Sequence, residues 1–220
     1  MVPVSGASAG GKRGQKMFHI IYNLINSANC SGMAPEPADG GGFTNATLPD
    51  GMAMPGFYII VNTLTNNRYI GISGNIRERF KTRLATVTEM GFNAAVMRAI
   101  GVTWGRVQAL DSDRDQVLEL PTGPVWNPIN HGAVIPPGDD STFKLTLDGV
   151  DINLERLLIR FVLIQLGAGG TVSNNQMAAT PYVNPTQNTI RVWLGWDGMG
   201  GLFDPGWQRA DWLPGDDGAW

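Results

Sequence analysis

Apolar and polar residues alternate most clearly in two short runs that lie close together in the chain. The runs FYIIVN (57–62) and RYIGIS (68–73) are rich in residues that favour strands, and the polar segment TLTNN joins them. Two such runs around a short polar loop predict a β-hairpin. A third strand is predicted over WGRVQAL (104–110), and a further short hairpin strand over FKLTLDG (143–149).

Helical spacing of apolar residues follows the hairpin. Asn75 is suited to be an N-cap, and Glu78 three residues later resembles a capping box, so a helix is predicted from there through Leu84 or slightly beyond. Its buried face would carry Ile76, Phe80, Leu84 and Val87. The strongest helical pattern is INLERLLIRFVLIQLG (152–167), and shorter helices are predicted over 18–28 and 90–100.

These elements predict an α/β (α+β) fold with a small three-stranded antiparallel sheet flanked by helices and long loop-rich embellishments. Three parts are expected along the chain. Residues 1–54 would form a mobile tail, a short helix and a loop, and residues 55–180 the core, with a loop-rich insertion at about 108–150. Residues 181–220 carry five of the seven tryptophans, so we expect an irregular extension packed on the core.

Composition narrows the class of protein. The chain has 220 residues, 43% of them hydrophobic, and no apolar run long enough to cross a bilayer, so we expect a soluble, cytoplasmic protein without membrane contact. One cysteine, Cys30, excludes an internal disulfide framework and a cysteine-rich zinc site, and the two histidines lie far apart. The net charge is −3, yet seven basic residues stand against two acidic ones between Arg68 and Arg106. A basic segment within an acidic chain indicates a localised site for a polyanion.

Glu155 is the most unusual residue of the long helix. It falls in line with Leu158, Ile159 and Val162, whereas Asn153, Arg156 and Arg160 form a stripe that should face water. A carboxylate on an apolar stripe is unfavourable unless it is paired or binds a cation. Two interpretations stay open: a buried salt bridge to an arginine of the helix after the hairpin, or a metal ligand.

Arg79 and Arg83 have the spacing of neighbours on one helix face. Solvated surface arginines are the commonest outcome of such a pair. Here, however, Tyr58 and Tyr69 lie on the paired strands just before, so both phenols can reach the same edge of the sheet. Two phenols, one or two guanidinium groups and a buried carboxylate would suit phosphodiester hydrolysis.

The same residues make the sequence resemble the GIY-YIG nucleases. The first signature triad of that family is matched by Gly56-Phe57-Tyr58 and the second by Tyr69-Ile70-Gly71. The run YIGISGNIRER then places the motif arginine at Arg79, and NLERLLIRF places the motif glutamate at Glu155. The family's downstream asparagine is matched by Asn174 or Asn175. The resemblance covers residues 55–107 well and residues 151–175 loosely.

What the resemblance implies is a one-metal DNA endonuclease. Tyr58 would act as general base or water-positioning group, Tyr69 would orient the water or contact phosphate, and Arg79 would hold the scissile phosphate. Glu155 would bind Mg²⁺, with Mn²⁺ as a substitute. The supporting residues would be Arg83, Asn174, Asn175 and Gly71, and double-stranded DNA would be contacted by Arg68, Arg77, Lys81 and Arg98.

The sequence departs from the pattern of the family at two positions. Phe57 replaces the middle isoleucine of the first triad, and Arg83 stands where many members have histidine or tyrosine. Since arginine does not accept a proton at neutral pH, Arg83 would stabilise charge.

The resemblance is compatible with a restriction enzyme, a homing or phage nuclease and a toxin. A homodimer would suit a restriction enzyme, and an inhibitor or immunity protein would accompany a toxin. The alternative is a non-catalytic DNA-binding or assembly protein that retains the fold.

Overall fold

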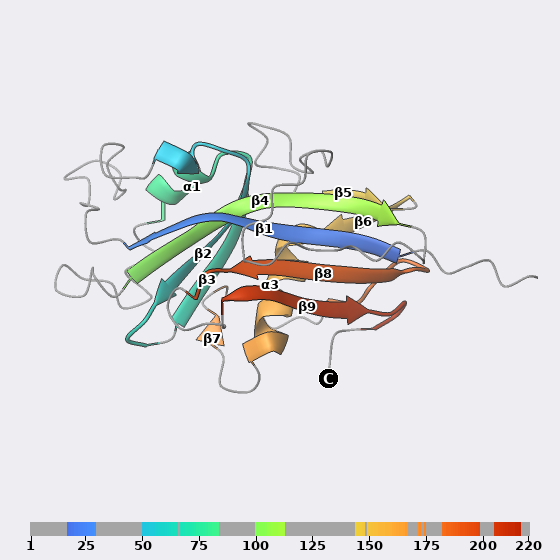
Figure 1. The fold of residues 1–220 in the computed structure, drawn as a ribbon. Coiled ribbons are helices and arrows are strands. Elements are labelled where there is room, and N and C mark those ends of the chain that lie inside the picture. The colour runs from blue at the N-terminus through green and yellow to red at the C-terminus, as the bar shows by residue number, and fades with distance from the viewer. Residues whose placement is uncertain are drawn as a thin grey trace, which may run out of the picture.

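The computed structural model describes residues 17–29, 50–65, 67–83, 100–112, 144–147, 149–166, 171–172, 174, 182–198 and 205–216. Together these residues form a mixed seven-stranded sheet, a separate two-stranded hairpin and two α-helices (Figure 1). The strand order across the sheet is β7-β3-β2-β4-β1-β8-β9. The strands are β1 (Met17–Asn29), β2 (Gly56–Asn62), β3 (Asn67–Ser73), β4 (Ile100–Ser112), β7 (Thr171–Val172), β8 (Thr189–Trp196) and β9 (Gly206–Trp212).

The elements predicted around the hairpin are confirmed. Strands β2 and β3 pair antiparallel, and β4 pairs antiparallel on the other side of β2. Helix α1 (Ile76–Lys81) follows β3, and the Asn75 side chain accepts a hydrogen bond from the Glu78 N–H, as an N-cap does. Strand β5 (Lys144–Leu147) pairs with β6 (Val150–Asn153), and α3 (Leu154–Leu166) begins directly after β6.

The predicted fold class is wrong. The protein is mostly β, because the three expected strands are only the part β3-β2-β4 of a sheet that continues through β1, β8 and β9. Strand β1 pairs with β4 antiparallel and with β8 parallel, so the sheet is mixed. It therefore unites segments from all three parts into which the sequence was divided.

The error at the N-terminus concerns the segment MFHIIYNLI, predicted as a helix and found as strand β1. Phe18, Ile20 and Tyr22 lie in the large core, while His19 and Ile21 on the opposite face are also buried. A strand buried on both faces has an almost continuous apolar run, and such a run does not show the alternation that distinguishes a strand from a helix.

The error at the C-terminus concerns the tryptophans. Strands β8 and β9 pair antiparallel at the end of the sheet, in a region predicted to be irregular. Trp196 and Trp212 are fully buried in the large core. The abundance of glycine and aspartate around these tryptophans concealed two strands with a regular buried face.

Hydrophobic residues cover the two faces of the sheet unequally. On one side, which we call the α3 face, residues such as Ile59, Val192 and Leu194 pack against Leu158 and Phe161 of the helix. Figure 1 shows α3 lying behind β1, β8 and β9. The opposite side, the α1 face, holds a small cluster of seven buried residues: Met52, Tyr58, Ile60, Ile76, Phe80, Val102 and Trp104.

Both helices differ slightly from their predicted lengths. Helix α1 ends at Lys81 rather than Leu84, because the Thr82 and Arg83 N–H groups turn back to the carbonyls of Arg79 and Phe80. The predicted buried positions Leu84 and Val87 lie outside the described residues, as does the predicted helix at 90–100 apart from Ile100, which begins β4. No helix in the described ranges is both long and apolar enough to span a bilayer.

Candidate active site

Two tyrosines on neighbouring strands form the centre of the site. The rings of Tyr58 on β2 and Tyr69 on β3 lie 6.2 Å apart between centroids, with their planes 31° from parallel. Phe80 of α1 meets the Tyr58 ring edge-on at 6.2 Å. Tyr58 is fully buried, whereas Tyr69 remains partly exposed. The sequence-predicted convergence of the two phenols is therefore present.

Gly71 makes room for the Tyr58 ring. It is the direct cross-strand partner of Tyr58, and a Cβ atom at this position would overlap the phenol ring. Gly56 has a φ of 155°, and a Cβ there would overlap the carbonyl oxygen of Gly105 on β4. Both triad glycines thus allow a close approach that any side chain would prevent.

Arg83 contacts both phenols. Its Nε donates a hydrogen bond of 3.3 Å to the Tyr58 hydroxyl, and its Cζ lies 5.4 Å from the centroid of the Tyr69 ring, within cation–π range. This contact is possible because α1 ends at Lys81, so that Arg83 lies in the following turn and not on the helix. The sequence predicted only a supporting role for Arg83, whereas the structure puts it at the centre of the cluster.

Glu155 approaches this cluster from the first turn of α3. Asn153 caps the helix, since its Oδ1 accepts a hydrogen bond of 3.0 Å from the Arg156 N–H. Burial raises the pKa of the Glu155 carboxyl to about 7, and the nearby positive charges of Arg83 and Arg79 limit this rise. Glu155 in turn disfavours ionisation of Tyr58 and Tyr69. Carboxylate, phenols and arginines therefore share one electrostatic environment.

Of the two interpretations of Glu155, the salt bridge to an arginine of the helix after the hairpin is not found among the described residues. Neither an ion pair nor a hydrogen bond to a described residue engages its carboxylate. The two arginines act on it only through longer-range attraction. The carboxylate oxygens consequently have lone pairs available to a ligand, in a side chain that is only partly exposed.

The two phenols differ in acidity. Burial, and next the neighbouring Tyr69, raise the pKa of Tyr58 well above its ordinary value, even though Arg83 opposes the change. Burial also raises the pKa of Tyr69, but Arg83, Arg79 and a hydrogen bond from Tyr58 lower it. Burial of Arg83 disfavours its charge, yet Tyr58, Tyr69 and Glu155 outweigh burial and raise the pKa of the guanidinium. Arg83 therefore stays charged beside both hydroxyls.

Asn174 secures the strand that carries Tyr69. Its Oδ1 accepts a hydrogen bond of 2.9 Å from the Ile70 N–H, and its Nδ2 donates one of 2.7 Å to the Ile70 carbonyl. Strand β7 pairs with β3 only at Asn67 and Arg68, so the amide of Asn174 takes the place of a neighbouring strand beyond that point. Asn174 thus holds the backbone at Ile70, the middle residue of the second triad.

Several predicted residues lie elsewhere. Arg68 is only 4% exposed, which argues against the DNA contact assigned to it, and burial lowers the pKa of its guanidinium. Lys81 pairs with Glu78 at 2.7 Å on the outer side of α1, and Arg77 is half-buried beside it. Arg98 and Asn175 are outside the described residues.

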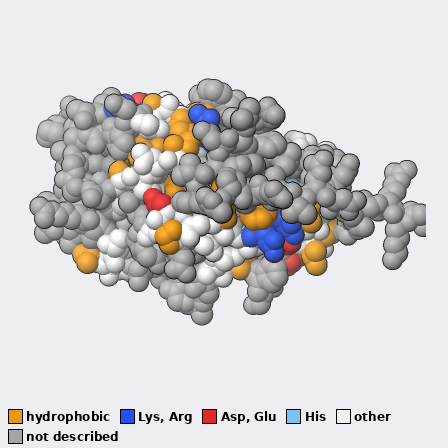
Figure 2. Space-filling model, viewed as in Figure 1, with side chains coloured by type: hydrophobic (Ala, Val, Ile, Leu, Met, Phe, Trp, Pro, Cys, Tyr) orange, Lys and Arg blue, Asp and Glu red, His pale blue; other side chains and the backbone are white. Residues whose placement is uncertain are grey.

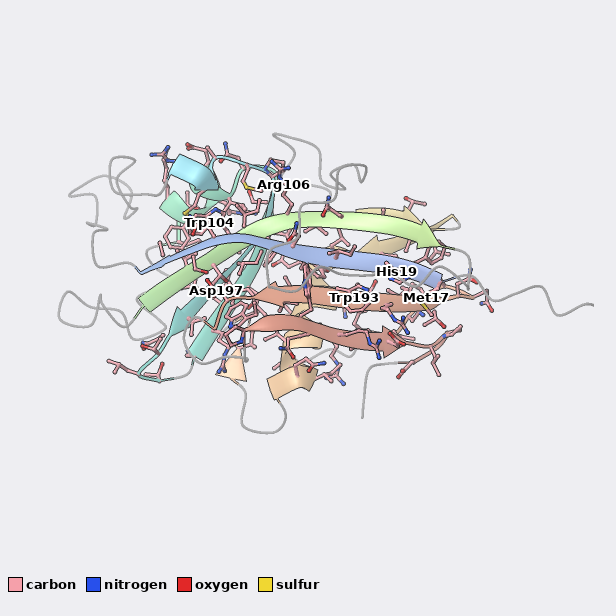
Figure 3. All side chains as sticks on the ribbon, viewed as in Figure 1. Met17, His19, Trp104, Arg106, Trp193 and Asp197 are labelled. Carbon is pink, nitrogen blue, oxygen red and sulfur yellow. The ribbon has the colours of Figure 1, made fainter. Side chains whose placement is uncertain are left out.

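Two further residues, which the sequence did not indicate, belong to the same buried cluster as Tyr58. Trp104 on β4 is the cross-strand neighbour of Tyr58, and its Nε1 donates a hydrogen bond of 3.1 Å to the Gly51 carbonyl (Figure 3). Met52, in the 3₁₀ turn Asp50–Met52, is fully buried in the same cluster. No local pattern marks the turn as part of the site, because its segment has the composition of a loop.

The site fits a metal held by one carboxylate. Within the described ranges there is no group of three His, Cys, Asp or Glu side chains, so an ion enclosed by protein ligands is not supported there. Mg²⁺ is commonly held by one or two carboxylates, with water and substrate phosphate completing its coordination. The partly exposed carboxylate of Glu155, which pairs with no described residue, could supply that one protein ligand.

Comparison with family models, with curated proteins and with solved structures finds no match to this chain.

Proposed function

We propose that this protein is a metal-dependent endonuclease that hydrolyses DNA phosphodiester bonds with a GIY-YIG-type active site. The observation that carries the proposal is the convergence of Tyr58, Tyr69, Arg83 and Glu155, which come from two strands, a turn and a distant helix. Packing alone does not require this convergence, since Glu155 has no salt bridge to a described residue and an apolar side chain could be buried there at less cost.

Two roles follow from exposure. Tyr69 is the phenol that reaches solvent, so it is better suited to orient the attacking water or contact the phosphate. Tyr58 is fully buried, and burial raises its pKa, so the role of general base expected from the resemblance suits it poorly. We assign Tyr58 to holding Arg83 and Tyr69 in place through its hydroxyl.

The arginines supply positive charge. Arg83 lies against both phenols, and Arg79 acts on Tyr69 and Glu155 from the last turn of α1. Both would stabilise the negative charge that develops on the phosphoryl oxygens. This assignment gives Arg83 the charge-stabilising role that its inability to accept a proton requires.

Glu155 would hold Mg²⁺, with Mn²⁺ as a substitute. When bound, the ion would supply Lewis-acid stabilisation of the phosphate and favour ionisation of water. Binding requires the ionised carboxylate, and the pKa of Glu155 near 7 makes this form available at and above neutral pH.

The substrate and setting belong to the same proposal. Basic residues concentrated between Arg68 and Arg106 support a polyanionic partner, for which we propose double-stranded DNA in the cytoplasm. Arg191 and Arg209 lie on β8 and β9, where Figure 2 shows basic and acidic side chains together. Arg191 is bound there by both Asp211 carboxylate oxygens, so we do not assign this patch to DNA.

The test is incubation of the purified chain with supercoiled plasmid and Mg²⁺, beside an EDTA control and the variants Glu155→Gln and Tyr69→Phe. Nicking or linearisation is expected for the wild type, with at least a hundredfold loss in Glu155→Gln. The matched control is Asp151→Asn, since Asp151 is an exposed carboxylate on β6, four positions before Glu155.

An unreactive wild type that still shifts DNA in a gel would replace this proposal with the non-catalytic DNA-binding protein. Equal losses in Glu155→Gln and Asp151→Asn would show that the site assignment is wrong even if the chain cuts DNA.

A further inference from the structure

The start of α3 is held by a tyrosine from the middle of the sheet. The Tyr22 hydroxyl donates a hydrogen bond of 2.7 Å to the carbonyl oxygen of Leu154, the residue directly before Glu155. Tyr22 is fully buried, so this hydroxyl has no access to solvent as an alternative partner. The contact joins residues 132 positions apart in the chain, which makes it a tertiary constraint on the first turn of the helix.

The position of Tyr22 is itself rigid. Its strand is paired on both sides, through Val107 of β4 and Leu194 of β8. Its ring meets the Phe57 ring edge-on at 5.6 Å, and Phe57 is the middle residue of the first triad. A short hydrogen bond from such a fixed side chain transmits the position of the sheet to the backbone beside Glu155.

A second tyrosine holds the other side of the same turn. The Tyr182 hydroxyl accepts a hydrogen bond of 3.2 Å from the Asn153 N–H, and the Arg156 guanidinium lies 5.9 Å from the centroid of its ring. The loop after Tyr182 is anchored in turn, because the Asn184 amide donates to the Trp212 carbonyl at the end of β9. The two residues that precede Glu155 are therefore both bound by phenols.

We propose that Tyr22, assisted by Tyr182, is a positioning residue for the Glu155 carboxylate, and this inference rests on the proposed function of that site. The hydroxyls act on the backbone at Asn153 and Leu154, and the helix carries their effect to Glu155. Strands outside the predicted core would then help to position Glu155 in the proposed site. Strand β1 supplies Tyr22, and the β8–β9 end of the sheet anchors the loop of Tyr182.

The test uses the full chain with Tyr22→Phe, which removes the hydroxyl and keeps the ring. The matched control is Thr103→Val, which removes another buried hydroxyl bonded to a backbone carbonyl, that of Ile59 on β2 and not one of α3. Amide hydrogen exchange is measured along α3, and Mn²⁺ binding is measured by electron paramagnetic resonance without DNA. Glu155→Gln serves as the reference for lost metal binding.

In Tyr22→Phe we expect about fivefold faster exchange at the Leu158 amide, the helical partner of the Leu154 carbonyl, and no change at Leu163. Mn²⁺ affinity should fall about tenfold, as for other residues that orient a metal ligand. Thr103→Val should change neither quantity. Tyr182→Phe should act in the same direction as Tyr22→Phe, and it decides the matter if Tyr22→Phe does not fold.

Unchanged exchange at Leu158 with wild-type Mn²⁺ affinity would overturn the inference, as would faster exchange spread evenly over α3. If the wild type neither binds Mn²⁺ nor cuts DNA while exchange at Leu158 alone rises in Tyr22→Phe, the proposed function fails and the positioning of Glu155 stands.

Discussion

The two faces of the sheet differ in the size of their buried clusters and in the polar groups that lie beside them. The α3 face carries the large core, in which strands from both ends of the chain pack on one helix. The α1 face carries a cluster of seven buried residues beside the two phenols, and its helix is only six residues long. The small cluster buries less apolar surface than the large core, so we attribute most of the stability of the sheet to the large core and, under the proposed function, the placing of polar groups to the small cluster.

The composition of the two clusters agrees with this division. The large core is built almost entirely from aliphatic and aromatic side chains, and its buried hydroxyls serve the backbone, as that of Tyr22 does. In the small cluster the Tyr58 hydroxyl is instead bonded to the Arg83 side chain, which also contacts Tyr69. Substitutions on the two faces should therefore separate unfolding from loss of activity.

The largest loss of stability is expected for Phe161→Ala on the α3 face. Phe161 is fully buried and its ring lies 6.2 Å from that of Trp212, so truncation would leave a cavity that costs about 4 kcal/mol. Chemical denaturation measures this loss, with the exposed Leu64→Ala as a control that should change stability by less than about 0.5 kcal/mol. Plasmid cleavage per folded molecule should be unchanged; its loss at a temperature where the variant is folded would contradict the division between the faces.

Gly71→Ala tests the α1 face, with a smaller effect on stability and a larger one on activity. The added methyl group overlaps the Tyr58 ring, and displacing that ring should cost about 2 kcal/mol. The displaced phenol can no longer bond Arg83, so cleavage should fall by about a hundredfold. Gly51→Ala is the control, since a Cβ there meets Trp104 at an ordinary 3.8 Å. Wild-type cleavage by Gly71→Ala would show that the position of the Tyr58 ring is not required for activity.

Local sequence patterns were sufficient for the part of the fold whose contacts are local. The hairpin, the Asn75 cap and α3 are each encoded by neighbouring residues, and all were predicted. The parallel pairing of β1 with β8 joins Met17 to Thr189, and no local pattern encodes it. The long apolar run of β1 and the glycine-rich surroundings of β8 and β9 also conceal the alternation that identifies strands.

The candidate site was predictable to a similar extent. Strand pairing places Tyr58 and Tyr69 side by side, and helical spacing places Glu155 on the apolar side of α3, where it lies. The central position of Arg83 depends on α1 ending two residues before it, whereas the helical spacing of apolar residues in the sequence continues to Leu84 and beyond. The contact of Tyr22 with Leu154 could not be predicted, because the apolar run of β1 lacks the alternation that identifies a strand.

The smallest change in stability is expected from Glu155→Gln. The pH dependence of that change distinguishes a residue that serves the proposed chemistry from one that serves folding. A carboxyl whose pKa is about 7 in the folded protein and ordinary in the unfolded chain favours folding only while it is protonated. Its contribution is complete at low pH and is lost as the pH rises from about 4.5 to about 7. Glutamine avoids this loss, so the variant should match the wild type at about pH 4 and be more stable by about 1.5 kcal/mol at pH 8, a value reduced to allow for solvent screening. Denaturation at the two pH values, with Asp151→Asn beside it, measures the difference. If Glu155→Gln is the more stable protein at pH 8, the ionised carboxylate destabilises the fold, as expected of a residue that serves the proposed metal site. A variant less stable than the wild type at pH 8 would instead make Glu155 a structural residue and would contradict the division between the two faces.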